Sequence, residues 1–152
     1  MQMRYPSNPE KVRTFTTEQL RDEFLIDKLF SDDVLTLVYS HIDRIIVGGA
    51  CPVSTALELT ASKQDLGTDT FLERREVGIV NVGGAGTVTV DGADYAMSKL
   101  DGLYVGKGAR SVRFASADAS APAHFYFTST PAHTTYPTTH IPISRAAPNH
   151  LG

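Results

Sequence analysis

The sequence predicts an all-β fold, a sandwich or barrel with Greek-key or jelly-roll connections, preceded by one short helix. From Val34 onward, apolar and polar residues alternate with a period of two, and β-branched and aromatic residues gather in short runs. Glycine, proline or aspartate separates these runs, which recur about every ten residues. Because many short strands occur without long helices between them, we expect antiparallel sheets.

One helix is expected before the strands, over about residues 17–25. Thr16 and Gln19 have the spacing of a capping box, in which each satisfies a backbone N–H group of the first turn. Leu20 and Phe24 follow at positions i and i+4, so they share one face of the helix.

The turn signals between the strands are specific. The expected strands cover residues 34–40, 43–47, 56–60, 77–82, 86–90, 94–97, 103–105, 111–114 and 124–128. Asp91-Gly92 predicts a two-residue hairpin, because glycine accepts the positive φ of a type I′ turn. The glycine-rich residues 83–86 predict another turn rather than a phosphate loop, since no Lys-Ser or Lys-Thr follows and the flanks are strands.

The composition indicates one domain that binds neither nucleic acid nor membranes. Its 152 residues are 41% hydrophobic, which is enough for a core in a chain of this length. The net charge of −3 leaves no broad basic field for a phosphate backbone, and no run approaches the ~20 apolar residues of a membrane helix. The N-terminus lacks a signal peptide's apolar stretch, and the single cysteine, Cys51, fits a reducing compartment. We therefore expect a cytoplasmic protein, with Cys51 as a packed side chain rather than a nucleophile.

The chain divides into an arm, a barrel and a second arm. Residues 1–15 are polar and are expected to form an N-terminal arm before the barrel, which spans residues 16–130. Residues 131–152 are expected to be an extended arm or a linker, because prolines prevent a helix or a central strand. These prolines are Pro131, Pro137, Pro142 and Pro148.

The histidines give only a weak metal hypothesis. There are five, at positions 41, 124, 133, 140 and 150, and no two have the i, i+2 or i, i+4 spacing that presents both rings to one ion. His41 is expected to be partly buried and held by hydrogen bonds. His133 lies in a compact polar and aromatic segment, for which a substrate or interface role is a candidate. A metal site made by His41, His124 and His133 remains a further alternative.

Five segments of the sequence, taken in order, resemble one family. They are YSHIDRIIVGG at 39–49, FLERRE at 71–76, GGAGTVTVDG at 83–92, LYVGKGA at 103–109 and PAHTTYPT at 131–138. Together they closely resemble the N-terminal half of the 5-keto-4-deoxyuronate isomerase family, also called 4-deoxy-L-threo-5-hexosulose-uronate ketol-isomerases. The resemblance runs from about Leu20 to Thr138.

The resemblance implies a cupin-type β-barrel from an enzyme of pectin and uronate breakdown. Members interconvert 5-keto-4-deoxyuronate and 3-deoxy-2,5-diketogluconate. They have two cupin-like halves, assemble as hexamers, and hold zinc through three histidines and a glutamate of the C-terminal half. This sequence stops before that half, so we expect a structural barrel that packs against the catalytic one, supplies oligomer contacts and lacks activity alone.

The general cupin pattern also places no zinc ligands here. Glu76 and Gly83 keep the pattern's glutamate-to-glycine spacing, but residues 69–72 occupy the place of its first two histidines. The later histidine falls near Ser111. Zinc is therefore expected in the full-length family protein and not in this chain.

A substrate with a carboxylate group is expected to be bound by arginine side chains. A guanidinium pairs with carboxylates through a planar fork, which makes Arg44, Arg74 and Arg75 candidates, although a charged run such as residues 73–76 usually lines a solvated strand entry. His133 and Tyr136 complete the candidate substrate-binding set. The alternative function is a stand-alone, non-catalytic cupin that binds sugar acids, with Arg74, Arg75, His133 and Tyr136 lining an open barrel mouth.

Overall fold

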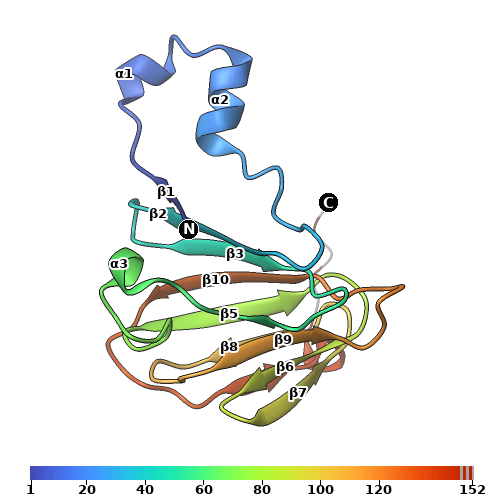
Figure 1. The fold of residues 1–152 in the computed structure, drawn as a ribbon. Coiled ribbons are helices and arrows are strands. Elements are labelled where there is room, and N and C mark those ends of the chain that lie inside the picture. The colour runs from blue at the N-terminus through green and yellow to red at the C-terminus, as the bar shows by residue number, and fades with distance from the viewer. Residues whose placement is uncertain (148, 150, 152) are drawn as a thin grey trace.

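Two β-sheets packed face to face form the body of the molecule (Figure 1). The structure, a computed structural model, describes residues 1–147, 149 and 151. The seven-stranded sheet has the order β1-β2-β3-β10-β5-β8-β11, and the four-stranded sheet has the order β4-β9-β6-β7. The strands are β1 (Gln2–Arg4), β2 (Leu35–Ser40), β3 (Ile46–Ala50), β4 (Leu57–Glu58), β5 (Arg75–Asn81), β6 (Gly86–Val90), β7 (Ala93–Met97), β8 (Gly102–Val105), β9 (Val112–Ser116), β10 (Phe125–Pro131) and β11 (Thr139–Ile141). The helices are α1 (Pro9–Val12), α2 (Thr17–Phe24), α3 (Lys63–Leu66) and the 3₁₀ turn η1 (Ile143–Arg145).

The strand pairing is that of a jelly roll. Strands β3 and β10, β4 and β9, β5 and β8, and β6 and β7 pair antiparallel. Among these eight strands the first therefore pairs with the last, and each later pair is nested inside the one before it. The pairs alternate between the two sheets, as in the double-sheet jelly roll to which cupins belong. The predicted fold class is therefore confirmed. One detail differs: the sheets stay separate instead of closing into a continuous barrel, since no ladder joins them within the described part of the chain.

The core fills the space between the sheets. Along β5 the side chains alternate, so that Val77 and Ile79 are buried while Gly78 and Val80 face outward. Phenylalanines occupy the centre, with the ring centroid of Phe114 5.2 Å from that of Phe125 and 5.6 Å from that of Phe127. All three rings are fully buried. The space between the sheets is thus packed with apolar side chains.

Two hairpin turns use residues with positive φ. Asp91 (φ 48°) and Gly92 (φ 87°) join β6 to β7, as expected for a type I′ turn. Between β2 and β3, Asp43 and Arg44 both have φ of 55°. This turn corrects the strand predicted for residues 43–47, which begins only at Ile46. No glycine marked the turn in the sequence.

The glycine-rich segment 83–86 carries the chain from β5 of one sheet to β6 of the other. The backbone N–H of Gly84 donates to the carbonyl of Pro122 at 2.8 Å, so it is not free to bind a phosphate. A Cβ atom on Gly86 would lie 2.6 Å from the carbonyl oxygen of Ala115. The segment is therefore a close-packed turn, as predicted.

The predicted helix is confirmed as α2, with its capping box. The Thr16 hydroxyl accepts from the Gln19 backbone N–H at 3.3 Å, and the Gln19 side chain accepts from the Thr16 N–H at 2.8 Å. Figure 1 shows α1 and α2 projecting beyond β1, away from the sheets. The Arg4 guanidinium holds this projection by donating to the carbonyls of Glu23 (3.1 Å) and Leu25 (2.6 Å).

Both expected arms contain short strands at the sheet edges. Within residues 1–15, β1 pairs parallel to β2; within residues 131–152, β11 pairs antiparallel to β8. Residues 148, 150 and 152, at the end of the second arm, lie outside the described residues. No helix in the described residues is long and apolar enough to span a membrane.

Candidate functional site

A pocket of about 210 Å³ lies at the end of the sandwich where β5 begins and β10 ends. It is bounded by the β2–β3 turn on one side and by α3 and the loop after it on the other. Its lining residues are Tyr39, Arg44, Asp65, Leu66, Thr68, Arg74, Arg75 and Pro131. The fold thus brings together the three arginines that the sequence singled out. We refer to this cavity as the arginine pocket.

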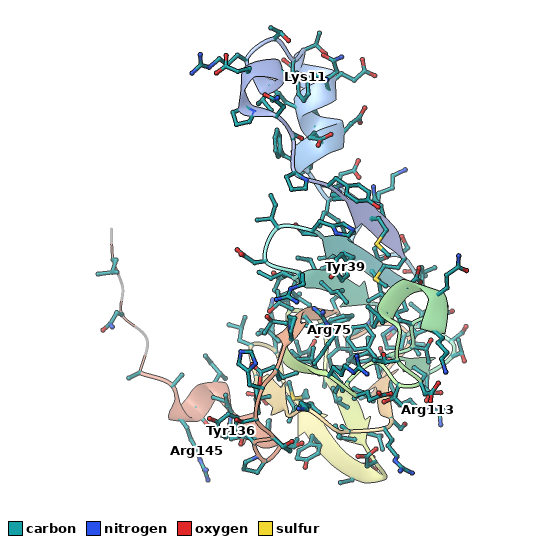
Figure 2. The ribbon with its side chains drawn as sticks, turned by 90° about the vertical axis from the view of Figure 1, so that its left-hand side faces the viewer. Lys11, Tyr39, Arg75, Arg113, Tyr136 and Arg145 are labelled. Atoms are coloured by element: carbon teal, nitrogen blue, oxygen red, sulfur yellow. The ribbon has the colours of Figure 1, made fainter. Side chains whose placement is uncertain are left out.

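Arg75 is the most constrained of the three arginines, with only 7% of its surface exposed. As the first residue of β5 it points inward beside β10, where its Nε donates to the Ser129 hydroxyl at 3.1 Å and its Nη2 to the Ser129 carbonyl at 2.7 Å. Nη2 also donates to the Arg44 carbonyl at 2.7 Å. The guanidinium carbon lies 5.8 Å from the centroid of the Tyr39 ring; both residues are labelled in Figure 2. Arg75 is therefore fixed by neutral groups.

No salt bridge between described residues involves Arg75. Burial, reinforced by the charge of Arg44, lowers the pKa of Arg75 from its ordinary value, while Tyr39 acts in the opposite direction. An arginine nevertheless stays protonated at neutral pH, because its pKa starts above 12. The bottom of the pocket consequently carries a buried positive charge.

The other two arginines stand at the rim. Arg44 sits in the tight β2–β3 turn, and this turn conformation directs its carbonyl to Arg75. Arg74 is exposed, and its Nε lies 3.9 Å from a carboxylate oxygen of Glu73 in a pairing that water screens strongly. Asp65 is the one acidic residue of the lining, so positive charge predominates in the pocket.

His133 and Tyr136 are not among the residues that line the arginine pocket. His133 is exposed, and its backbone carbonyl accepts from Lys107 Nζ at 3.4 Å. Tyr136 is 59% exposed and lies apart from Arg75 in Figure 2. The three arginines therefore line this pocket without His133 and Tyr136, and a substrate-binding role for these two residues stays a prediction.

The three histidines of the metal alternative do not meet. His41 is exposed and stacks on Tyr5, with ring centroids 4.3 Å apart, instead of being partly buried and hydrogen-bonded as expected. His124 stacks on Phe30 at 5.1 Å. Among the described residues there is no group of three His, Cys, Asp or Glu side chains that could hold a metal ion.

Glu76, the residue that keeps the cupin glutamate spacing, points away from the interior. It alternates on β5 with the inward-facing Arg75 and Val77, and its carboxylate accepts from the Tyr104 hydroxyl at 2.7 Å on the outer face. Apolar side chains occupy the interior, where a cupin metal would lie. The described residues therefore do not fit a zinc ion.

Sequence reasoning missed the residues that shape the arginine pocket around the guanidiniums. Ser129 anchors Arg75, and its inward position follows from the alternation along β10. Tyr39 and Asp65 come from elements far from β5 in the sequence, so only the assembled fold shows their proximity. The Ser62–Asp65 capping spacing of α3 was the signal available for that helix.

These features define a jelly-roll domain of the cupin class, with a filled apolar interior and a basic pocket at one end. The sequence matches the KduI/IolB family over residues 24–152, and the chain belongs to this family.

Curated relatives have the same residue as this chain at about half of the aligned positions. Proteins named 4-deoxy-L-threo-5-hexosulose-uronate ketol-isomerase from Lachnoclostridium phytofermentans and Halalkalibacterium halodurans are each 50% identical over 152 residues. The same-named protein from Escherichia coli is 49% identical over 153 residues. The matches cover 100% of this chain but 55% of each relative, so the chain spans about half of their length and corresponds to their N-terminal part.

Two of the matching solved structures are distant in sequence and cover part of the fold. The Clostridium difficile EutQ protein matches with a TM-score of 0.45 and 16% identity, over 64% of this chain and 61% of that chain. A cupin protein from Bacteroides fragilis matches with a TM-score of 0.41 and 15% identity, over 80% of this chain and 93% of that chain.

Proposed function

We propose that this chain is the N-terminal, non-catalytic domain of a 4-deoxy-L-threo-5-hexosulose-uronate ketol-isomerase. The observation that carries the proposal is the 50% identity that extends over the whole chain while covering 55% of the relatives. Identity of this level over the whole chain supports the same fold as in the N-terminal part of the relatives, and the same position within a longer protein. The substrate proposed for the full-length protein is accordingly a small uronate derivative.

The packing of the domain supports a structural role within that enzyme. An aldose–ketose isomerisation moves a proton between adjacent carbons and needs a base beside a polarised carbonyl. The interior of this domain instead holds Phe114, Phe125 and Phe127, which are fully buried and packed against one another. The proposal therefore assigns the reaction, and the zinc that the family resemblance implies, to the part of the relatives beyond this domain.

The proposal also covers assembly and location. The family resemblance suggests a homohexamer in which this domain packs against the catalytic cupin half.

A cytoplasmic location is supported by Cys51, which is buried as a free thiol near Asp32, as suits a reducing compartment. Burial raises the pKa of this thiol, which favours a packed side chain over a nucleophile.

Isomerase assays on two proteins test the proposal. The purified chain, supplied with zinc, should not convert the 5-keto-4-deoxyuronate. A fusion of this chain to the remaining segment of the Lachnoclostridium phytofermentans relative should do so, with that segment alone as the control. Turnover by the chain alone would refute the assignment of catalysis to the other half. Full activity of the isolated segment would refute the structural role of this domain.

A further inference from the structure

Arg75 holds a buried positive charge that no acidic side chain of the described residues neutralises. Burying a charge is costly unless an opposite charge or strong hydrogen bonds compensate it. The Ser129 side chain and the carbonyls of Ser129 and Arg44 supply hydrogen bonds through Nε and Nη2. These bonds leave Nη1 without a protein partner in the described structure.

We propose that the arginine pocket binds the carboxylate of a sugar acid, with the guanidinium of Arg75 at its base and Arg44 and Arg74 at its rim. The choice of a uronate among sugar acids rests on the proposed function. The binding of a carboxylate does not, because it follows from the charge and shape of the pocket.

The arrangement favours tight positioning of one anionic group. Three hydrogen bonds and the Tyr39 ring already fix the Arg75 side chain, so binding costs little additional rotamer entropy. A carboxylate that reaches Nη1 gains a charge-assisted hydrogen bond inside a partly desolvated cavity. The rim arginines add attraction from a greater distance.

The rest of the lining suits the body of a sugar acid. The volume of about 210 Å³ equals the space of roughly seven water molecules, which admits a carboxylate with part of its sugar ring. Leu66, Pro131 and the Tyr39 ring supply apolar surface for C–H groups, whereas the Asp65 carboxylate is an acceptor for sugar hydroxyls. Thr68 donates to the Thr70 carbonyl at 2.9 Å, which leaves its oxygen free to accept a hydroxyl.

The lining also favours a sugar acid over a bare anion. The Asp65 carboxylate can accept sugar hydroxyls, and Leu66 and Pro131 can contact sugar C–H groups, whereas inorganic phosphate has no carbon body for these contacts. We therefore expect a uronate to bind more tightly than inorganic phosphate.

Calorimetry on the full chain tests the site with galacturonate, galactose and inorganic phosphate as probes. The variants are Arg75→Gln and Arg74→Gln, with Arg113→Gln as the control. Arg113 lies on the exposed side of β9 in the other sheet, far from Arg75 in Figure 2. Because Arg75→Gln removes buried hydrogen bonds and can impair folding, circular dichroism accompanies each titration. Arg74 is exposed, so its replacement leaves the fold intact.

Galacturonate should bind one-to-one, more weakly as salt increases, while galactose gives no heat and phosphate binds less tightly. Arg74→Gln should weaken binding about threefold, and a folded Arg75→Gln more than about tenfold. Arg113→Gln should leave binding unchanged. Absence of galacturonate binding, equal weakening by Arg113→Gln, or equal binding of galactose would overturn the proposal, and tighter binding of phosphate would overturn its carboxylate selectivity. Heat is measured without turnover, so the result is independent of the isomerase assays.

Discussion

Tyr104 donates its hydroxyl hydrogen to Glu76 Oε2 over 2.7 Å, on the outer face of the seven-stranded sheet. Gly78, two residues along β5 from Glu76, is the register partner of Tyr104 on β8, so the two side chains are diagonal neighbours across the ladder. The glutamate that keeps the cupin spacing is thus an acceptor in a surface hydrogen bond. Glu76 therefore faces away from the space between the sheets, and residues 69–72 lack the histidines that would accompany it in the cupin pattern.

Removing the Tyr104 hydroxyl should reduce stability. Desolvation, together with the hydrogen bond to Glu76 and the charge of that residue, raises the pKa of Tyr104 to about 12. Because the folded pKa is above the unfolded value of 10.0, the stabilisation is complete below pH 10 and is lost as the pH rises toward 12. Tyr104→Phe should lower the free energy of unfolding by about 1 kcal/mol at neutral pH, measured by urea denaturation. Tyr136→Phe is the control, and an equal loss there would contradict the role of the bond.

The phenylalanine cluster should dominate the stability of the sandwich. Phe114 is fully buried between Phe125 and Phe127, so Phe114→Ala leaves a cavity and should lower the free energy of unfolding by about 3–5 kcal/mol. Phe24, at the end of α2, is 58% exposed. Phe24→Ala should therefore change the free energy of unfolding by less than about 0.5 kcal/mol. Thermal or urea unfolding of both variants checks the contrast. Similar losses at the two positions would show that the interior is not close-packed.

Asp101 should fasten the segment around η1 to the sandwich. Its buried carboxylate accepts the backbone N–H groups of Ile143 and Ser98, both at 2.8 Å. The hydrogen bond from the Ile143 N–H makes the largest contribution to lowering the pKa of Asp101 from its ordinary value of 3.8. A depressed folded pKa means that this stabilisation is present above pH 3.8 and is lost as the pH falls below it.

Hydrogen exchange at the Ile143 amide measures this attachment. Asp101→Asn removes the charge from the acceptor, so exchange at Ile143 should become at least about tenfold faster at neutral pH, which corresponds to ~1.4 kcal/mol. Asp27→Asn, at an exposed position, should leave that amide unchanged. Unaltered exchange in Asp101→Asn would show that other contacts hold the segment.

Gly86 on β6 and Gly78 on β5, two strands that follow one another in the chain, should respond oppositely to substitution by alanine. At Gly86 the added Cβ would lie 2.6 Å from the Ala115 carbonyl oxygen and 2.7 Å from the Phe125 ring, so Gly86→Ala should lower the free energy of unfolding by about 1–3 kcal/mol. At Gly78 no atom lies within 4 Å of the added Cβ, and the substitution should be neutral or stabilising by up to about 1 kcal/mol. Urea denaturation distinguishes the two. A larger loss at Gly78 would contradict the strand packing described here.

The sequence predicted the central strands well because their periodicity is strong. Alternation of buried and exposed residues located β5 and β6, and Asp91-Gly92 located β7, the hairpin partner of β6. The edge strands β1 and β11 were missed because each has only three residues and forms through tertiary pairing rather than local pattern. The start of β3 was misplaced because Asp43 and Arg44 adopt positive φ without a glycine.

The candidate site was predicted only in part, for a geometrical reason. The carboxylate-pairing chemistry of guanidinium groups was enough to select Arg44, Arg74 and Arg75 from the sequence. Their convergence depends on the β2–β3 turn meeting the start of β5, which no local signal reveals. His133 and Tyr136 were grouped with them, but neither residue lines the arginine pocket.

The metal content of the purified chain tests most directly the claim that this domain is a scaffold with a filled interior. The purified chain is dialysed against a zinc solution and then against zinc-free buffer. Elemental mass spectrometry should then find far less than one zinc ion per chain. One zinc ion retained per chain, together with turnover of the ketouronate, would contradict the account.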